Sequence, residues 1–342
     1  MMTTMPSQST TGSDFAVLSR RITDAGLMRR RPAYYVVRLS IVTLMFVGGW
    51  AAFFALGSSW WQMITAVFLA VTFAQVALVA HDLAHRQVFR TRRPSAVAGL
   101  LAGNLGIGMS YGWWMDKHTR HHNNPNHDDL DPDVAPEVLV WTTESAIGRR
   151  GLKGFITRHQ ATLFFPLLTL LAVSLKVSSV KALRDGTVKQ RRVESALLIL
   201  HAVGYLGALV LVLSPPQAVA FLLLHQALFG VYLGMTFAPN HKGMPHPTGT
   251  EDYLRKQVLT SRNVRGNRLV DAALGGLNYQ IEHHLFPGMP TSNLRKAQPI
   301  VQAYCAEIGV AYVQTGLVTS YRQALRHLHE VGAPARAEHA RR

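Results

Sequence analysis

Four long runs of apolar residues dominate the hydropathy pattern of the chain. They cover about residues 36–56, 60–80, 196–213 and 218–237, and each approaches the ~20 residues that a helix needs to cross a bilayer. Only a few polar residues separate the first run from the second and the third from the fourth. Length and all-round hydrophobicity favour membrane spans over buried helices of a soluble protein, so the pattern predicts two tight transmembrane hairpins.

Two further apolar segments are less regular than these runs. Residues 96–110 are short and rich in glycine, and residues 161–180 are interrupted by Pro166 and Lys176. The first segment is too short to span a bilayer, and the second contains a helix breaker and a charge. We expect both to be interfacial or re-entrant elements.

Composition adds information about orientation and partners. The chain has 342 residues, 48% of them hydrophobic, and its 35 Lys and Arg outnumber its 19 Asp and Glu, which gives a net charge of +16. Such a charge is typical of nucleic-acid-binding proteins, but here the basic residues flank the apolar runs instead of forming a continuous stripe. Because Lys and Arg are absent from both hairpin turns, we expect the turns outside, the chain ends in the cytosol, and no nucleic acid partner.

Cys305 is the single cysteine of the sequence. One thiol forms no intrachain disulfide and holds no iron–sulfur cluster, since such clusters need several thiolates. Any electrons that the protein uses must therefore come from another molecule.

Histidine is frequent, with 16 residues, and half of them gather near the ends of the apolar runs. Three clusters repeat the i, i+3 or i+4 spacing that brings side chains to one face of a helix. The clusters are His81 and His85, then His118, His121 and His122, and then Gln280, His283 and His284, while His241 stands alone after the fourth run.

Neutral imidazole binds iron, copper, zinc and nickel, so the clusters predict a metal site if they meet. One ion rarely takes more than about six ligands, and a zinc hydrolase site uses about three from the protein. The number of histidines therefore indicates two ions. Ring nitrogens that face away from a metal need partners, and nearby acidic residues are candidates: Asp82, Asp116, Asp128, Asp129 and Glu282.

A shared site requires all three clusters to lie on one side of the membrane. Two hairpins return the chain to the same side, whereas a fifth crossing at 161–180 would separate His283 from His81. The predicted fold is thus an all-α integral membrane protein with four transmembrane helices, interfacial helices and a cytosolic helical metal-binding cap. Its predicted parts are a flexible polar tail (1–32), a membrane domain (33–304) and a cytosolic helical C-terminal tail (305–342).

The order of the clusters, H-x-x-x-H, H-x-x-H-H and Q-x-x-H-H, resembles the integral-membrane fatty acid desaturase family. Neighbouring motifs strengthen the resemblance over about residues 36–304: Trp113-Trp114 before Lys117-His118, Asn-Pro-Asn at 124–126, Asp-Pro-Asp at 131–133, Asn-His-Lys-Gly-Met at 240–244, and residues 280–287. The third cluster, with Gln280, is similar to that of front-end desaturases, which act between an existing double bond and the carboxyl end. The His-Pro-Gly-Gly motif of the cytochrome b5 domain that those enzymes often carry is absent, so we expect a separate reductant.

The resemblance implies two iron ions held mainly by histidines. The implied ligands are His81, His85, His118, His121, His122, His283 and His284, with His241 matching a further family histidine. His225 is the rival of His241, but it lies within the fourth run and is expected in the core. Gln280 stands where many relatives have histidine and is a candidate ligand. Trp113 and Trp114 are candidates for the mouth of a substrate tunnel, or equally for interfacial anchors.

The function implied by the resemblance is an O2-dependent fatty acyl desaturase that introduces a double bond into the acyl chain of an acyl-CoA or acyl-lipid. The implied electron donor is a separate ferredoxin, rubredoxin, cytochrome b5 or flavin reductase. The implied location is a membrane, the inner membrane in a bacterium, with active site and termini cytosolic. Two alternatives remain: a membrane di-iron hydroxylase of alkane, carotenoid or sphingolipid, and a non-catalytic membrane metal-binding or transport protein. Transporters usually place polar ligands within spans, whereas these clusters lie at or beyond the span ends.

Overall fold

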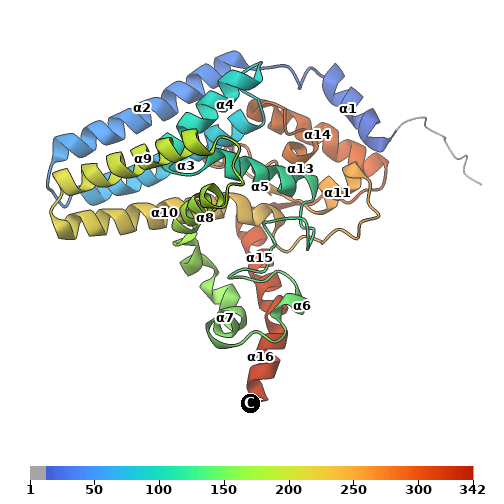
Figure 1. The fold of residues 1–342 in the computed structure, drawn as a ribbon. Helices are drawn as coiled ribbons and strands as arrows, with labels where there is room; N and C mark the ends of the chain where they lie inside the picture. Colours follow the sequence, from blue (N-terminus) through green and yellow to red (C-terminus); the bar gives the residue numbers. More distant parts are fainter. Residues whose placement is uncertain (1–12, 342) are drawn as a thin grey trace, which may run out of the picture.

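Four long helices lie side by side in the computed structural model, which describes residues 13–341 (Figure 1). They are α2 (Pro32–Leu56), α3 (Gln62–Ala84), α9 (Arg191–Val212) and α10 (Pro215–His241). Each is long and apolar enough to cross a membrane, which confirms the four predicted spans and the all-α membrane fold. α3 and α10 continue past the predicted ends at 80 and 237 and thereby include His81 and His241.

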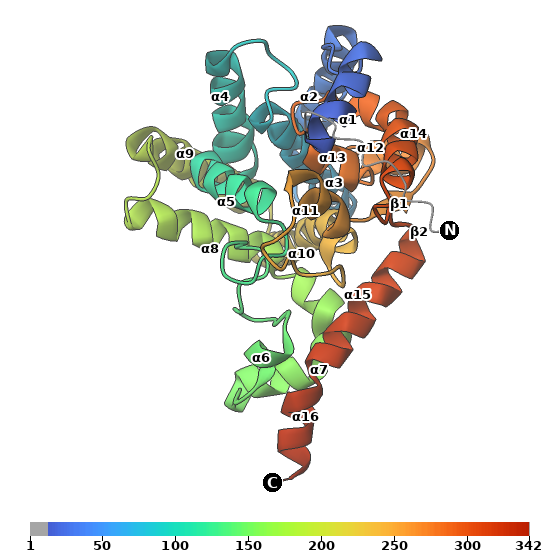
Figure 2. The same ribbon diagram turned by 90° about the vertical axis from the view of Figure 1, so that its right-hand side faces the viewer.

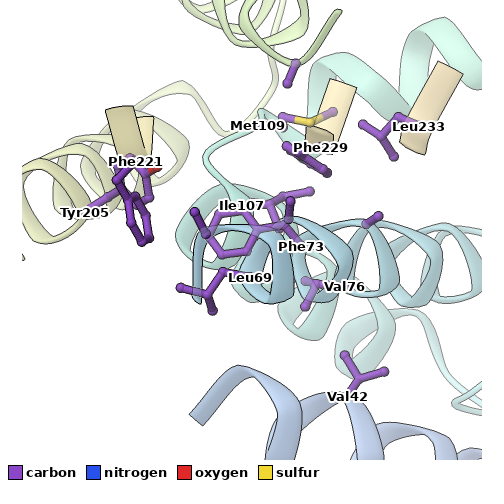
Figure 3. Packing of buried hydrophobic residues seen from close by; sticks show 14 of the residues in the cluster. Val42, Leu69, Phe73, Val76, Ile107, Met109, Tyr205, Phe221, Phe229 and Leu233 are labelled. Atoms are coloured by element: carbon purple, nitrogen blue, oxygen red, sulfur yellow. The ribbon is translucent and has the colours of Figure 1, made fainter. Parts of the chain in front are cut away.

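Aromatic side chains join the two hairpins into one bundle. Phe73 of α3 meets Phe229 of α10 with ring centroids 5.8 Å apart, and Phe53 of α2 meets Phe221 of α10 at 5.3 Å. Figure 3 shows Ile107 packed beside Phe73 in this core. Aromatic side chains bury large apolar areas and dominate the packing energy of a core. The bundle is therefore a stable support for the elements at its end.

Most of the shorter elements lie around one end of the four long helices, whereas α6, α7, α15 and α16 extend away from it (Figures 1 and 2). The helices are α4 (Arg92–Leu100), the π-helical turn η1 (Leu101–Gly106), α5 (Tyr111–Asn123), α6 (Thr143–Ala146), α7 (Gly151–Leu168), α8 (Leu171–Arg184), α11 (Tyr253–Leu259), α12 (Arg268–Ala273), α13 (Gln280–Leu285), α14 (Thr291–Glu307), α15 (Leu317–Val331) and α16 (Ala333–Ala340). A single pair of parallel strands, β1 (Asn263–Arg265) and β2 (Gln314–Gly316), interrupts the helical pattern of the described residues.

The two irregular apolar segments differ in shape from the long helices. Residues 96–110 form the end of α4, the turn η1 and the loop that follows. Residues 161–180 fall in two helices, α7 and α8, whose axes bend by 84° just after Pro166. Counted as one unit, this bent pair is apolar enough for a fifth span, so its interfacial or re-entrant position stays a prediction.

The N-terminal region is more ordered than its polarity predicts. Residues 1–12 lie outside the described part. Ser13 caps the helix α1 (Asp14–Asp24): its side-chain oxygen accepts a hydrogen bond from the Ala16 amide. Leu18 and Ile22 of α1 are fully buried in a cluster with residues of α11, α13 and α14. The prediction of a flexible tail is therefore wrong for residues 14–24, because α1 has an apolar face that this cluster covers.

The predicted boundary at residue 304 is also wrong, because α14 runs through it to Glu307. The helices beyond it, α15 and α16, agree with the expected helical character. They are not a detached tail, since α15 packs against α7 and α10 and its Leu328 is fully buried.

Truncation of Leu328 should show whether α15 belongs to the folded unit. We expect Leu328→Ala to lower the free energy of unfolding by about 2–5 kcal/mol, because it leaves a cavity between packed helices. The matched control is Val318→Ala on the same helix, whose side chain is 63% exposed and whose loss should change stability by less than about 0.5 kcal/mol. Thermal unfolding of the purified protein in detergent measures both, and equal melting temperatures for the two variants would contradict the packing described.

Candidate metal centre

Eight histidines from four elements converge at the end of the helical bundle. α3 supplies His81 and ends just before His85, and α10 ends at His241. α5 contributes three histidines and α13 contributes two, which follow Gln280: His118, His121 and His122, then His283 and His284. The three clusters predicted from the sequence therefore meet at one place, together with His241.

A group of five histidines forms the first half of the centre. One ring nitrogen from each lies within 4.8 Å of the others in the set His81, His85, His118, His122 and His283. The Nε2 atoms of His85 and His118 are 2.8 Å apart, and those of His118 and His122 are 3.1 Å apart. The Nε2 atom of His81 is buried without a hydrogen-bond partner among the described residues.

The second half is a group of three histidines, His121, His241 and His284, whose ring nitrogens also lie within 4.8 Å of one another. The Nε2 atoms of His241 and His284 are 3.1 Å apart, and the Gln280 amide lies 2.9 Å from Nε2 of His241. The His122 and His284 rings stack at 4.3 Å, so the two halves adjoin.

Acceptors outside this second group set the tautomer of its rings. Nδ1 of His121 lies 2.9 Å from a carboxylate oxygen of Asp131, and Nδ1 of His241 lies 3.1 Å from the Thr260 carbonyl. Nδ1 of His284 lies 2.9 Å from the side-chain oxygen of Gln257. Because all three partners accept, each Nδ1 carries the proton and each Nε2 offers a lone pair to the common centre. Lone pairs that converge in this way fit a metal ion.

Burial keeps these rings neutral. It lowers the pKa of His118, His122, His283 and His284 well below the ordinary 6.5, and the neighbouring imidazoles lower it further. A neutral imidazole is the form that binds a metal, so the site is ready for ligation at neutral pH.

A buried polar network positions α5 under the centre. Ser110 caps the helix by accepting the Trp113 amide at 3.1 Å, and its hydroxyl donates to Glu194 of α9 at 2.6 Å. Asn104 of η1 donates to the same carboxylate at 3.0 Å. This network anchors the start of α5 to α9 and η1, which fixes the direction in which its histidines project.

α13 is fixed by the strand that precedes it. The side-chain oxygen of Asn263 in β1 accepts the Ile281 amide at 2.9 Å, and its nitrogen donates to Glu282 at 2.7 Å. Tyr312 donates to the other oxygen of Glu282 at 2.7 Å, and burial raises the pKa of that carboxyl to about 7. Glu282 thus holds α13 in place.

Most of the acidic residues expected to accept hydrogen bonds from the outward-facing ring nitrogens lie elsewhere. Asp116 pairs with Arg120 on the exposed face of α5, Asp128 pairs with His246, and Asp129 is exposed. Asp82 does lie beside the centre, where it binds Arg38 at 3.0 Å, but it is 3.6 Å from Nδ1 of His81, too far for a hydrogen bond.

The partners that do support the rings lie outside the predicted set: Asp131, Gln257 and the Thr260 carbonyl. The Asp-Pro-Asp motif at 131–133 was a usable signal for Asp131. No pattern in the sequence marks Gln257 or Thr260, because they come from α11 and the loop after it.

His225, Trp113 and Trp114 lie in three different surroundings. His225 lies in the bundle core with Nδ1 2.9 Å from the Tyr205 hydroxyl, away from the centre. Trp114 stacks on His118 with centroids 4.4 Å apart and lines a cavity, whereas Trp113 packs beside Leu183 and Val188 and does not line it.

This cavity has a volume of about 300 Å³ and a mainly apolar wall. It reaches the centre at His81, His118, His121, His241 and Gln280, and extends between α7, α8 and α10 along Phe164, Leu168, Leu171, Leu175 and Leu233. Its shape and wall suit an apolar chain next to the histidines.

The comparison with known proteins agrees with this arrangement. The family model "Fatty acid desaturase" matches residues 58–316, which is most of the chain. The chain belongs to the fatty acid desaturase family. Its membrane helices and histidine groups are those expected for such a desaturase, and the family expectation is confirmed.

Three relatives illustrate the match. The acyl-lipid (9-3)-desaturase of Physcomitrium patens is 30% identical over 92% of this chain, which spans 62% of that protein. Fatty acid desaturase 3 of Bos taurus is 30% identical, covering 93% of this chain and 73% of its own length. The Delta(6)-fatty-acid desaturase fat-3 of Caenorhabditis elegans is 28% identical, covering 95% and 76%.

Asp131 offers a test of the tautomer argument. We expect Asp131→Asn to weaken metal binding about 10–100-fold, because both carboxylate oxygens of Asp131 also accept backbone amides, of Asn126 and Asp133, and the NH2 group of Asn would oppose them and displace the acceptor of His121. Asp116→Asn, on the exposed face of α5, is the matched control and should bind as the wild type does. Metal titration of the purified variants measures both affinities, and indistinguishable values would contradict the role of Asp131.

Acidification should release the metal. Burial lowers the pKa of His118, His122, His283 and His284 in the folded site, whereas unfolded histidines take up protons below about pH 6.5, so protons favour the metal-free and unfolded states as pH falls. We expect metal content and melting temperature both to decrease between about pH 6.5 and 5. Elemental analysis after dialysis at each pH measures the first, and constant content down to pH 5 would contradict neutral imidazole ligation.

Proposed function

We propose that this protein is an O2-dependent fatty acyl desaturase that introduces a carbon–carbon double bond at a pair of iron ions. The observation that carries the proposal is the adjoining five- and three-histidine groups, four of whose histidines line an apolar cavity. The names of its relatives, all desaturases, support the reaction type and favour it over hydroxylation.

In the proposed site, one iron ion is held by His81, His85, His118, His122 and His283, and the other by His121, His241 and His284 with Gln280 beside them. When bound, the irons supply, with O2 and two electrons, the oxidising power to remove hydrogen from an unactivated acyl chain. The balanced reaction converts CH2–CH2, O2, two electrons and two protons into CH=CH and two molecules of water.

The remaining residues orient the chain and exclude water. Trp114, Phe164, Leu168, Leu171 and Leu233 all line the cavity. An apolar wall of this kind binds methylene groups favourably and offers few hydrogen-bond partners to water. The position of the histidines along the cavity would then select which carbons react.

The electrons are proposed to come from a separate carrier, and the site to face the cytosol. The single cysteine supports the separate carrier, because one thiol cannot hold an iron–sulfur cluster. The distribution of basic residues supports the cytosolic site, because arginines follow α3 while the hairpin turns carry neither Lys nor Arg.

Expression in a host with a known fatty-acid profile tests the function. We expect new unsaturated acyl chains with the wild-type gene, and none with His121→Ala or His284→Ala, because each removes a ligand from the second group. Both variants should still insert in the membrane, as shown by fractionation and blotting. An added hydroxyl in place of a double bond would refute desaturation, and full activity of either variant would refute the ligand assignment.

A further inference from the structure

A second cavity also borders the histidine centre. It has a volume of about 520 Å³ and a wall of mixed polar and apolar surface, and it is lined by His85, His118, His122, Arg30, Arg86 and Arg90, among others. His85 and His118 are the half-buried members of the five-histidine group. This is therefore the place where the metal ligands come nearest to solvent.

Three arginines line this cavity, Arg30, Arg86 and Arg90. We call them the arginine rim. Arg30 donates hydrogen bonds to the carbonyls of Arg86 at 2.8 Å and Phe89 at 2.6 Å. It thereby fixes the loop between α3 and α4 that carries the other two. Arg86 adopts a left-handed backbone conformation with φ of 55°, which is uncommon for a residue with a side chain.

The rim presents uncompensated positive charge. Within residues 13–341, no carboxylate oxygen lies within 4.0 Å of a side-chain nitrogen of Arg30, Arg86 or Arg90. All three residues are exposed. A cluster of unpaired cations around an opening attracts acidic partners and raises their rate of association.

The two cavities have different chemistry, and both border the histidines. The first is apolar and suits the acyl chain, whereas the second is more polar and is lined by arginines. His118 lines both. An acyl chain in the first cavity would leave the second cavity free, so a second reactant can approach from the arginine rim.

We propose that the arginine rim is the docking surface for an acidic one-electron carrier protein, which delivers electrons over the exposed edges of His85 and His118. This inference rests on the proposed function. Each docked carrier gives up one electron and leaves oxidised, so two encounters supply the two electrons that the desaturation consumes. Short-lived redox complexes of this kind bury little surface and depend on charge complementarity, which the rim provides.

Anionic lipid headgroups are the competing occupants, since arginines next to a span also bind phosphates. Headgroup anchoring, however, needs no cavity that leads to metal ligands. The continuity of the rim with His85, His118 and His122 favours the carrier.

Binding measurements test the proposal without relying on turnover. We expect the iron-loaded wild-type protein in detergent to bind oxidised plant-type [2Fe–2S] ferredoxin or the soluble domain of cytochrome b5, with a Kd that rises with salt. The double variant Arg86→Gln/Arg90→Gln should raise that Kd about tenfold or more and reduce its salt dependence. Arg30 is left intact because it holds the loop. The matched control is Arg322→Gln/Arg326→Gln on α15, which lies well away from α4 in both views (Figures 1 and 2) and should not change the Kd.

Turnover distinguishes this inference from the proposed function. With reduced methyl viologen, which needs no protein docking, the double variant should match the wild type in rate and in KM for the acyl substrate. With the protein carrier its KM for that carrier should rise. If the wild type forms no double bond with methyl viologen, the proposed function fails, whereas the Kd comparison still stands.

Two results would refute the docking surface: an unchanged Kd for the carrier in the double variant, or failure of both carriers to bind the wild type. If the Kd for the carrier is unchanged and the double variant loses affinity for vesicles containing phosphatidylglycerol, the rim binds lipid headgroups instead. Iron content and elution as a single species show that the double variant is folded in each case.

Discussion

The burial of many imidazole rings in neutral form is the constraint on which the rest of this structure depends. Placing eight such groups together is unfavourable if any of them is charged, because buried like charges repel and lose hydration. The protein avoids this cost by giving the Nδ1 protons of the second group to fixed acceptors, namely Asp131, Gln257 and the Thr260 carbonyl. What remains at the centre of that group is a set of converging lone pairs, which a bound cation would stabilise.

The long helices and the shorter helices at their end both hold these rings. The long helices supply His81 and His241 at their ends, where the apolar runs give way to polar sequence. His85 follows directly after α3. α5 and α13 supply the other five, and each helix is fastened by buried polar residues, Glu194 for α5 and Asn263 for α13. A cap that was only loosely packed would not keep five nitrogens within 4.8 Å of one another.

Periodicity explains what could be predicted from the sequence. Apolar runs of about 20 residues indicated the four spans, and i, i+3 and i+4 spacing indicated which histidines share a face. Sequence spacing carries no information about contacts between distant segments, so it does not reveal Gln257 and does not separate Asp116 from the acidic residues that lie near the centre. Polarity is also a poor guide at the chain ends. It predicts a tail over residues 1–32, although Leu18 and Ile22 form an apolar face on α1 and Ser13 in front of it is a usable capping signal.

The stacking of Trp114 on His118 has a consequence for the redesign of this protein. One indole ring is both a wall of the apolar cavity and the support of an imidazole, with centroids 4.4 Å apart. A smaller residue at this position would widen the channel for bulkier or bent chains, yet it would also release the imidazole to rotate. In the proposed function, chain-length preference and metal retention would therefore be linked at this position, and variants selected for one property would carry changes in the other.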